Sequence, residues 1–207
     1  MKKLITVLNC LLAKSGAWAN DVVAPDVMVR NVTDEVLTIV RQDKDIQNGD
    51  STKTVQLVET KVLPHFDFER MTALAMGKDW RRASPAQKST LIEEFRTLLV
   101  RTYSKALTEY RNRGMTIKLL RMQPDSSDAR VRAKVHQPGG KSIQIDYDLE
   151  TSDHAWKVYD ISVDGISLVT NYRSSFGQMV SANGIDGLIK SLHDKNQSRS
   201  ASAAAKR

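Results

Sequence analysis

The spacing of apolar residues changes twice along the chain, and these two changes constrain the fold more than any other feature. Up to about residue 114, apolar residues recur every three or four positions, as on one face of a helix. From Thr116 to Val163 they alternate with polar residues, as in strands with one buried face, and the helical spacing returns beyond Gly165. A block of strands with helices before and after it indicates an α+β fold.

Several helices are expected before the strands. The first three are expected at about residues 25–45, 52–63 and 67–77. A longer helix follows, and its start is well marked because Ser84 can act as N-cap, Pro85 can occupy the first helical position and Gln87 can complete a capping box. One broad apolar stripe runs along this helix, and Gly114 is placed to close it.

Four strands are expected, at about residues 116–122, 128–136, 142–150 and 156–163. The short turns between them indicate a consecutive, largely antiparallel sheet. In the second and third strands Val131 and Ile145 belong to an apolar set, whereas Arg132 and Asp146 alternate out of phase with it. One face of the sheet is therefore predicted to be apolar and the other wet, with helices against the apolar face. Two further helices, 167–180 and 185–192, are expected after the sheet.

The first 19 residues have the layout of a cleaved secretory signal. Lys2 and Lys3 precede a short apolar run over residues 4–12, and Ala17-Trp18-Ala19 offers a small-residue cleavage site. We therefore expect an exported, periplasmic protein that begins at Asn20. The only cysteine, Cys10, lies in the removed segment, so the exported chain would carry no thiol. The alternatives are a frayed cytosolic N-terminus and a lipoprotein anchored through Cys10.

The formal net charge of +7 includes three lysines in this segment, Lys2, Lys3 and Lys14, and is +4 without them. Such a mildly basic surface favours anionic lipid headgroups or acidic protein partners, and it lacks the concentrated basic stripe of a nucleic-acid binder. We expect one domain over residues 20–195. Residues 196–207 are rich in serine, alanine and basic residues and are expected to be disordered.

The sequence holds no phosphate-binding glycine loop, nucleophile elbow, zinc helix or calcium loop. The strongest candidate for a metal or general-base site is the alternation of His65, Asp67 and Glu69 with phenylalanines, but the better interpretation makes Asp67 a helix N-cap. Asp146 and Asp148 alternate out of phase with the apolar set, which places them outside any pocket on that face. We therefore expect no enzyme, no metal and no cofactor.

Two groups of segments resemble the MlaC family, the periplasmic phospholipid-binding proteins of the Mla lipid-asymmetry pathway, also called the toluene-tolerance auxiliary family. The segments are 63–68 with 77–87, and 156–161 with 164–168 and 183–188. The similarity runs from about Val29 to Leu192. The resemblance implies an NTF2-like curved, largely antiparallel four-stranded sheet packed against several helices around an apolar cavity that takes the tails of a diacyl phospholipid.

The resemblance also implies a function. The protein would carry phospholipids between the outer and inner membranes and so maintain outer-membrane lipid asymmetry. Its partners would be an outer-membrane lipoprotein–porin complex and an inner-membrane MCE-domain protein with its ABC transporter. Two alternatives remain: an exported adaptor of an ABC transport system that binds only proteins, and a small NTF2-like pocket enzyme.

The cavity would be lined by the two apolar stripes that must face each other. The expected lipid-binding residues are Phe95, Leu98, Leu99, Tyr103 and Leu107 from the long helix, and Val131, Ala133, Val135, Ile143, Ile145 and Tyr147 from the sheet. Trp80, Ile166 and Val169 are expected near the rim. The alternative for all of them is an ordinary filled core, which the spacing of apolar residues does not distinguish from a cavity lining.

Overall fold

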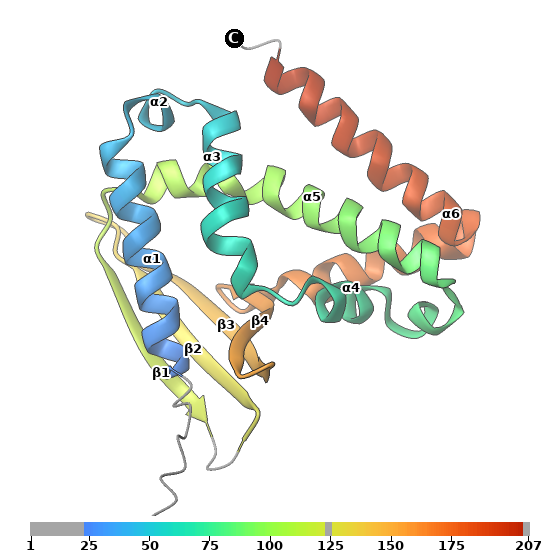
Figure 1. Ribbon diagram of the computed structural model, residues 1–207, viewed down its shortest axis with the longest axis horizontal. Coiled ribbons are helices and arrows are strands. Elements are labelled where there is room, and N and C mark those ends of the chain that lie inside the picture. The colour runs from blue at the N-terminus through green and yellow to red at the C-terminus, as the bar shows by residue number, and fades with distance from the viewer. Residues whose placement is uncertain (1–22, 123–125, 205–207) are drawn as a thin grey trace, which may run out of the picture.

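Three helices form the N-terminal part of the computed structural model, which describes residues 23–122 and 126–204. The expected signal segment, residues 1–19, lies outside this part. The three helices are α1 (Pro25–Gln42), α2 (Lys44–Gln47) and α3 (Ser51–Leu57). Asp43 and Asp50 cap α2 and α3, and each accepts bonds from two backbone N–H groups. α1 and α3 lie side by side (Figure 1) and enclose a small core, the α1–α3 core, of Val36, Val40, Ile46 and Leu57.

The connection from α3 to the rest of the chain is less regular than the sequence predicts. A single helix is expected up to Leu63, but the chain passes from α3 into a π-helical turn, η1 (Val58–Val62), and then into a 3₁₀ turn, η2 (Leu63–His65). Pro64 has no N–H group to continue an α-helix. Beyond this turn Phe66 forms a bridge to Val158, and the Asp67 N–H donates to the Val158 carbonyl at 2.9 Å.

The next helices begin where their capping residues predict. They are α4 (Phe68–Met76), η3 (Gly77–Arg82) and α5 (Pro85–Tyr110). Asp67 accepts the Arg70 N–H at 2.8 Å, which confirms its interpretation as the N-cap of α4. Ser84 and Gln87 form the predicted capping box, with bonds of 2.9 and 3.2 Å. α5 ends at Tyr110, before Gly114.

Within the described residues, the sheet has five antiparallel strands in sequence order. They are β1 (Met115–Met122), β2 (Asp128–Val135), β3 (Ile143–Ser152), β4 (Ala155–Val163) and β5 (Ile166–Ser167). The four expected strands are confirmed. β5 was not predicted, because a two-residue strand is too short to show an alternation of apolar and polar residues. It follows a tight turn at Asp164 and Gly165, both with positive φ.

The predicted separation of the two sheet faces is also confirmed. In the register of β2 and β3, Val131 lies opposite Tyr147 and Ala133 opposite Ile145, whereas Arg132 lies opposite Asp146. α1 covers the apolar face over β1 and β2 (Figure 1). There Val29 packs into the sheet core, which consists of Val29, Ile117, Ala129, Val131, Ala133, Leu149, Trp156 and Val158.

β1 forms one edge of the sheet, and two features interrupt that edge. The Arg30 guanidinium of α1 donates to the carbonyl of Ile117 at 3.0 Å. Further along, the pairing of β1 with β2 changes register between Leu119 and Arg121. The side chains of Leu119, Leu120 and Met122 are exposed in this region.

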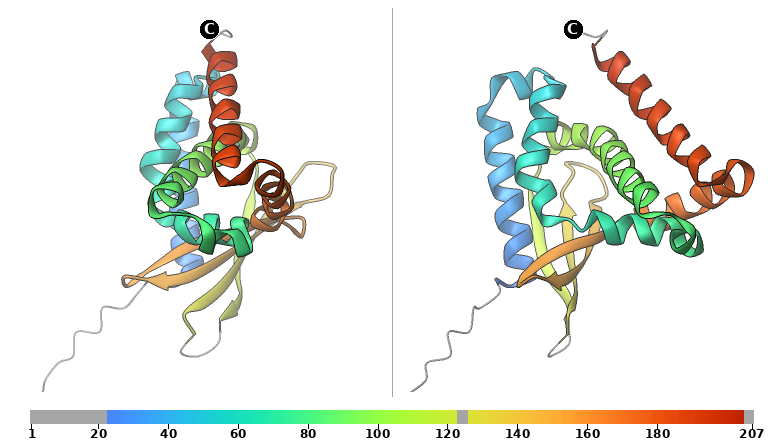
Figure 2. Two further views of the ribbon diagram at one scale, coloured as in Figure 1. Left: turned by 90° about the vertical axis from the view of Figure 1, so that its right-hand side faces the viewer. Right: turned by 45° about the vertical axis from the view of Figure 1, so that its right-hand side comes forward.

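The last helix, α6 (Leu168–Ala204), is bent at Gly184, whose φ of 69° and ψ of −178° are not helical. This confirms the predicted division near Gly184, and Figure 2 shows the final segment leaving the first at an angle. This final segment contacts α5 through the buried Asn196, whose side-chain amide donates to the Glu94 carbonyl at 2.9 Å. α6 extends to Ala204, whereas the sequence predicts disorder from Asn196 onward. Alanine and arginine are strong helix formers, and Asn196 anchors the segment to α5.

The largest core lies between α4, α5 and the two segments of α6. Phe95 meets the rings of Tyr172 and Phe176 edge to face, with centroids 5.0 and 5.2 Å apart. We call this the α4–α6 core. Its buried residues are Met71, Ala75, Met76, Ala83, Leu91, Phe95, Leu98, Leu99, Val169, Phe176, Val180, Leu188 and Leu192.

Candidate functional site

The apolar face of the sheet is unevenly covered. On β2, Val131 and Ala133 are fully buried. On β3, in contrast, Ile143, Ile145 and Tyr147 are only half-buried. Ile161 and Val163 of β4, which lie opposite Tyr147 and Ile145, are half-buried as well. We call these five half-buried residues of β3 and β4 the β3–β4 apolar strip.

The apolar stripe of α5 divides in the same way. Phe95, Leu98 and Leu99 are buried in the α4–α6 core. From Arg101 to Tyr110 no residue is fully buried, although the apolar spacing continues. Tyr103 is 40% exposed, and Leu107 packs partly against the α1–α3 core. The stripe that the sequence presents as one surface therefore serves two parts of the fold.

The β3–β4 apolar strip lies between three groups of helices. α1 packs on β1 and β2, while α4 and α6 pack on β4. α5 packs on α1, α3, α4 and α6, and Figure 1 shows it running from η3 to the ends of α1 and α3. The strip is therefore a part of the apolar face that the surrounding helices leave half-buried, and Tyr103 and Leu107 belong to the part of α5 in which no residue is fully buried.

The three residues expected at the rim, Trp80, Ile166 and Val169, lie in different surroundings. Val169 is buried in the α4–α6 core, and Trp80 packs against that core with the Lys88 ammonium 5.1 Å from its ring centre. Ile166 on β5 is 67% exposed and pairs with Val163, at the end of the strip. Ile166 alone of the three combines exposure with a position beside the strip.

Sequence reasoning missed Ile161 and Val163. The strict alternation of β4 would place Val158 and Asp160 on one face. A register irregularity opposite Asp148 and Leu149 inserts Tyr159, so that Leu149 pairs with Val158 and Tyr147 with Ile161. The phase of the apolar residues changes at this bulge, which alternation alone does not reveal.

On the polar face of the sheet, arginines of β2 form ion pairs with aspartates of β3. Arg132 binds Asp146, and Arg130 binds Asp148, each through two hydrogen bonds. The bond to Asp148 raises the pKa of Arg130. The two aspartates are therefore held by arginines on the side opposite the β3–β4 apolar strip, as the sequence predicts.

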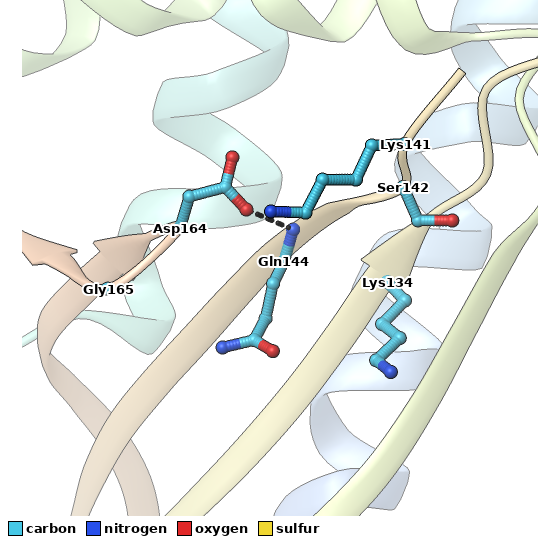
Figure 3. A pocket seen from close by; sticks show the side chains of 6 residues that line it. All are labelled: Lys134, Lys141, Ser142, Gln144, Asp164 and Gly165. Atoms are coloured by element: carbon cyan, nitrogen blue, oxygen red, sulfur yellow. Dashed lines mark hydrogen bonds between the residues drawn. The ribbon is translucent and has the colours of Figure 1, made fainter.

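Two hollows on the surface of the described residues are lined mainly by charged and polar residues. One, of about 410 Å³, lies at the turn between β4 and β5 and includes Lys134, Gln144 and Asp164. Figure 3 shows the Asp164 carboxylate next to the backbone N–H of Gln144, which donates to it at 3.0 Å. The other, of about 710 Å³, lies between η3 and α6 and includes Asp79 and Arg173. Neither combines a carboxylate pair or a histidine with apolar walls, as a pocket acid or base would require.

The segment around His65 forms a turn. Asp67 is engaged as a helix cap, and burial lowers the pKa of His65, with a smaller contribution from Lys157. Within residues 23–122 and 126–204, no three His, Cys, Asp or Glu side chains gather as a metal site would need.

None of the helices in the described part of the chain is long and apolar enough to cross a bilayer.

A half-buried apolar sheet face among helices is an arrangement that suits a protein binding an apolar ligand. The comparisons with known proteins specify the family. Residues 30–194 match the model of the MlaC protein family, and the chain belongs to that family.

Two curated relatives and one solved structure are similar to the chain. Toluene tolerance protein Ttg2D of Pseudomonas putida is 27% identical over 78% of this chain and 75% of its own. The intermembrane phospholipid transport system binding protein MlaC of Haemophilus influenzae is 21% identical over 93% and 92%. A phospholipid-binding protein from Ralstonia solanacearum, solved in complex with a phospholipid, is 35% identical, with a TM-score of 0.78 over 84% of this chain and 98% of its own.

Proposed function

We propose that this protein is a phospholipid carrier that moves lipids between the outer and inner membranes and so maintains the lipid asymmetry of the outer membrane. The observation that carries the proposal is the β3–β4 apolar strip, an uncharged part of the sheet left open between α1, α5 and the α4–α6 core. The similar Ralstonia protein was solved with a phospholipid bound, which supports the same ligand class for this chain.

The physical need for such a carrier is large. Each methylene that leaves water gains about 0.8 kcal/mol, so two acyl chains of roughly 30 carbons in total represent on the order of 25 kcal/mol. A lipid therefore does not cross an aqueous compartment bare. Aliphatic walls such as those of Ile143, Ile145 and Ile161 accept chains of different shape without leaving polar groups unpaired.

The burial pattern supports different roles for the expected lining residues. We assign acyl-chain contact to those that are half-buried or exposed: Tyr103, Leu107, Ile143, Ile145, Tyr147 and Ile166. The buried ones form the supporting walls behind them. These are Phe95, Leu98, Leu99, Val131, Ala133, Val135 and Val169, with Trp80 at the margin of the α4–α6 core.

The proposed route implies export and partners at both membranes. The signal-like layout of residues 1–19 supports export, and the name of the Haemophilus relative supports an intermembrane transport system. The partners would be an outer-membrane lipoprotein–porin complex and an inner-membrane MCE-domain protein with its ABC transporter. N-terminal sequencing of the periplasmic protein should begin at Asn20. An intact Met1 or a lipid on Cys10 would contradict export with cleavage.

Organic extraction of the purified protein, followed by mass spectrometry, tests the carrier function. We expect phospholipid at a near-stoichiometric yield. Ile145→Asp should abolish it, because a charge would lie where the acyl chains bind. Gln144→Asp introduces the same side chain on the polar face and is the matched control. Wild-type protein that takes up no phospholipid would refute the proposal and favour an adaptor that binds only proteins.

A further inference from the structure

Tyr147 places a polar group on the apolar face of β3. Five residues of this strand alternate onto that face: Ile143, Ile145 and Leu149 are aliphatic, and Thr151 lies at the far end of the strand, opposite Trp156. The fifth is Tyr147, which lies between Val131 of β2 and Ile161 of β4. Its phenol therefore projects from the middle of this face, between aliphatic neighbours.

The hydroxyl of Tyr147 has no hydrogen-bond partner within the described part of the chain. Its oxygen is not fully buried. The side chain belongs to the half-buried β3–β4 apolar strip, where a ligand of that strip would lie. Once a ligand covers the strip, a hydroxyl without an acceptor would cost free energy, and a ligand oxygen that accepts its hydrogen bond would avoid this cost.

The protonation state of this group is fixed. Burial raises the pKa of Tyr147 to about 12. The phenol therefore keeps its proton at any physiological pH, and it remains available as a neutral hydrogen-bond donor.

We propose that the Tyr147 hydroxyl donates a hydrogen bond to an ester carbonyl oxygen of the bound lipid and so selects ester-linked acyl chains. This inference rests on the proposed carrier function and adds a substrate preference to it. The bond would also fix how deeply the glycerol backbone enters, since the two acyl chains continue from the ester groups into the hydrocarbon surroundings.

The surroundings of Tyr147 favour an ester carbonyl over a phosphate as the acceptor. The nearest residues in register on this face are Val131 and Ile161, and the arginines and lysine of β2 point to the opposite face. Burying a charged phosphate without a cation is far more costly than burying a neutral ester. The phosphate is therefore expected nearer to solvent.

A competition experiment tests this assignment. Delipidated wild-type protein and Tyr147→Phe are each given a diacyl phosphatidylethanolamine and its dialkyl ether analogue, which have the same headgroup and chain length. Native mass spectrometry measures how much of each is bound. The wild type should prefer the diester about fivefold, the value expected for one neutral hydrogen bond. Tyr147→Phe keeps the ring and should bind both lipids equally.

Tyr159→Phe is the matched control, because Tyr159 lies at the bulge of β4 under the Arg70 guanidinium, away from the strip. It should keep the wild-type preference. Equal binding of both lipids by the wild type, or an unchanged preference in Tyr147→Phe, would overturn the inference and leave the carrier function standing. An equal loss of both lipids in Tyr147→Phe would identify phosphate as the acceptor and also overturn it. Binding of neither lipid by the wild type would refute the carrier function itself.

Discussion

Arg132 and Asp146 face each other across β2 and β3, joined by hydrogen bonds of 2.6 and 2.7 Å from the guanidinium to the two carboxylate oxygens. The next residues in register, Ala133 and Ile145, point to the other side of the sheet. A single strand pair therefore separates a charged surface from an apolar one. The acidic residues of β3 are engaged on the charged surface, which leaves the apolar one free of ionised groups.

The contrast between Ala133 and Ile145 distinguishes a filled core from a ligand site. Ala133 is fully buried, so Ala133→Phe should overfill the sheet core and lower the free energy of unfolding by about 1–3 kcal/mol. Ile145 is half-buried, so Ile145→Trp should leave the stability of the delipidated protein nearly unchanged but reduce the phospholipid that co-purifies. Urea denaturation and lipid extraction measure the two effects. Equal destabilisation by both substitutions would mean that the strip is ordinary core.

Asp160 connects the end of the sheet to the start of α6. Its carboxylate accepts the Ser167 hydroxyl at 2.5 Å and the Val169 N–H at 3.2 Å, and the side chain is nearly buried. Asp160→Ala should lower the free energy of unfolding by about 3 kcal/mol, because these donors lose a charged acceptor. Asp160→Asn keeps one acceptor oxygen and should cost less. A stability of Asp160→Ala equal to that of the wild type would show that the carboxylate is dispensable.

His65 should make the stability depend on pH below neutrality. Burial lowers its pKa in the folded state, so the unfolded chain takes up the proton first as the pH falls. Stability is complete above the unfolded value of about 6.5 and is lost as the pH falls through the lower folded value. Melting temperatures at pH 7.5 and 5.5 should differ less for His65→Gln than for the wild type. Identical differences would contradict this role of His65.

The capping box at the start of α5 allows a test with a control on the same helix. Ser84→Ala removes the oxygen that accepts the Gln87 N–H and should cost about 1 kcal/mol. Ser89→Ala is the same chemical change at an exposed position inside the helix, where alanine is the better helix former, and it should stabilise by a few tenths of a kcal/mol. Chemical denaturation measures both. Effects of the same sign would contradict the assigned cap.

The parts of the fold that were predictable depend on local chemistry. Ser84 with Gln87 and the N-cap Asp67 identify helix starts because the capping bonds join residues three apart. The alternation in β2 and β3 identifies the faces because each side chain follows from the pleat of its own strand. Neither signal requires knowledge of what packs against the element.

The candidate site depends on partners, and these were not predictable. The stripe of α5 indicates an apolar face, but its spacing does not reveal that Phe95 meets α6 while Leu107 meets α1 and α3. The bulge at Tyr159 changes which residues of β4 reach the apolar face. The continuation of α6 past Asn196 depends on a contact with Glu94, a residue distant in the sequence.

The interrupted edge of β1 has a consequence for how molecules of this protein meet one another. An open strand edge with exposed apolar side chains is a template on which a second chain can extend the sheet. Here the Arg30 guanidinium occupies the carbonyl of Ile117, and the register change before Arg121 breaks the regular ladder beside Leu120. We therefore expect edge-to-edge pairing of two copies to be disfavoured here, although Leu119, Leu120 and Met122 are exposed.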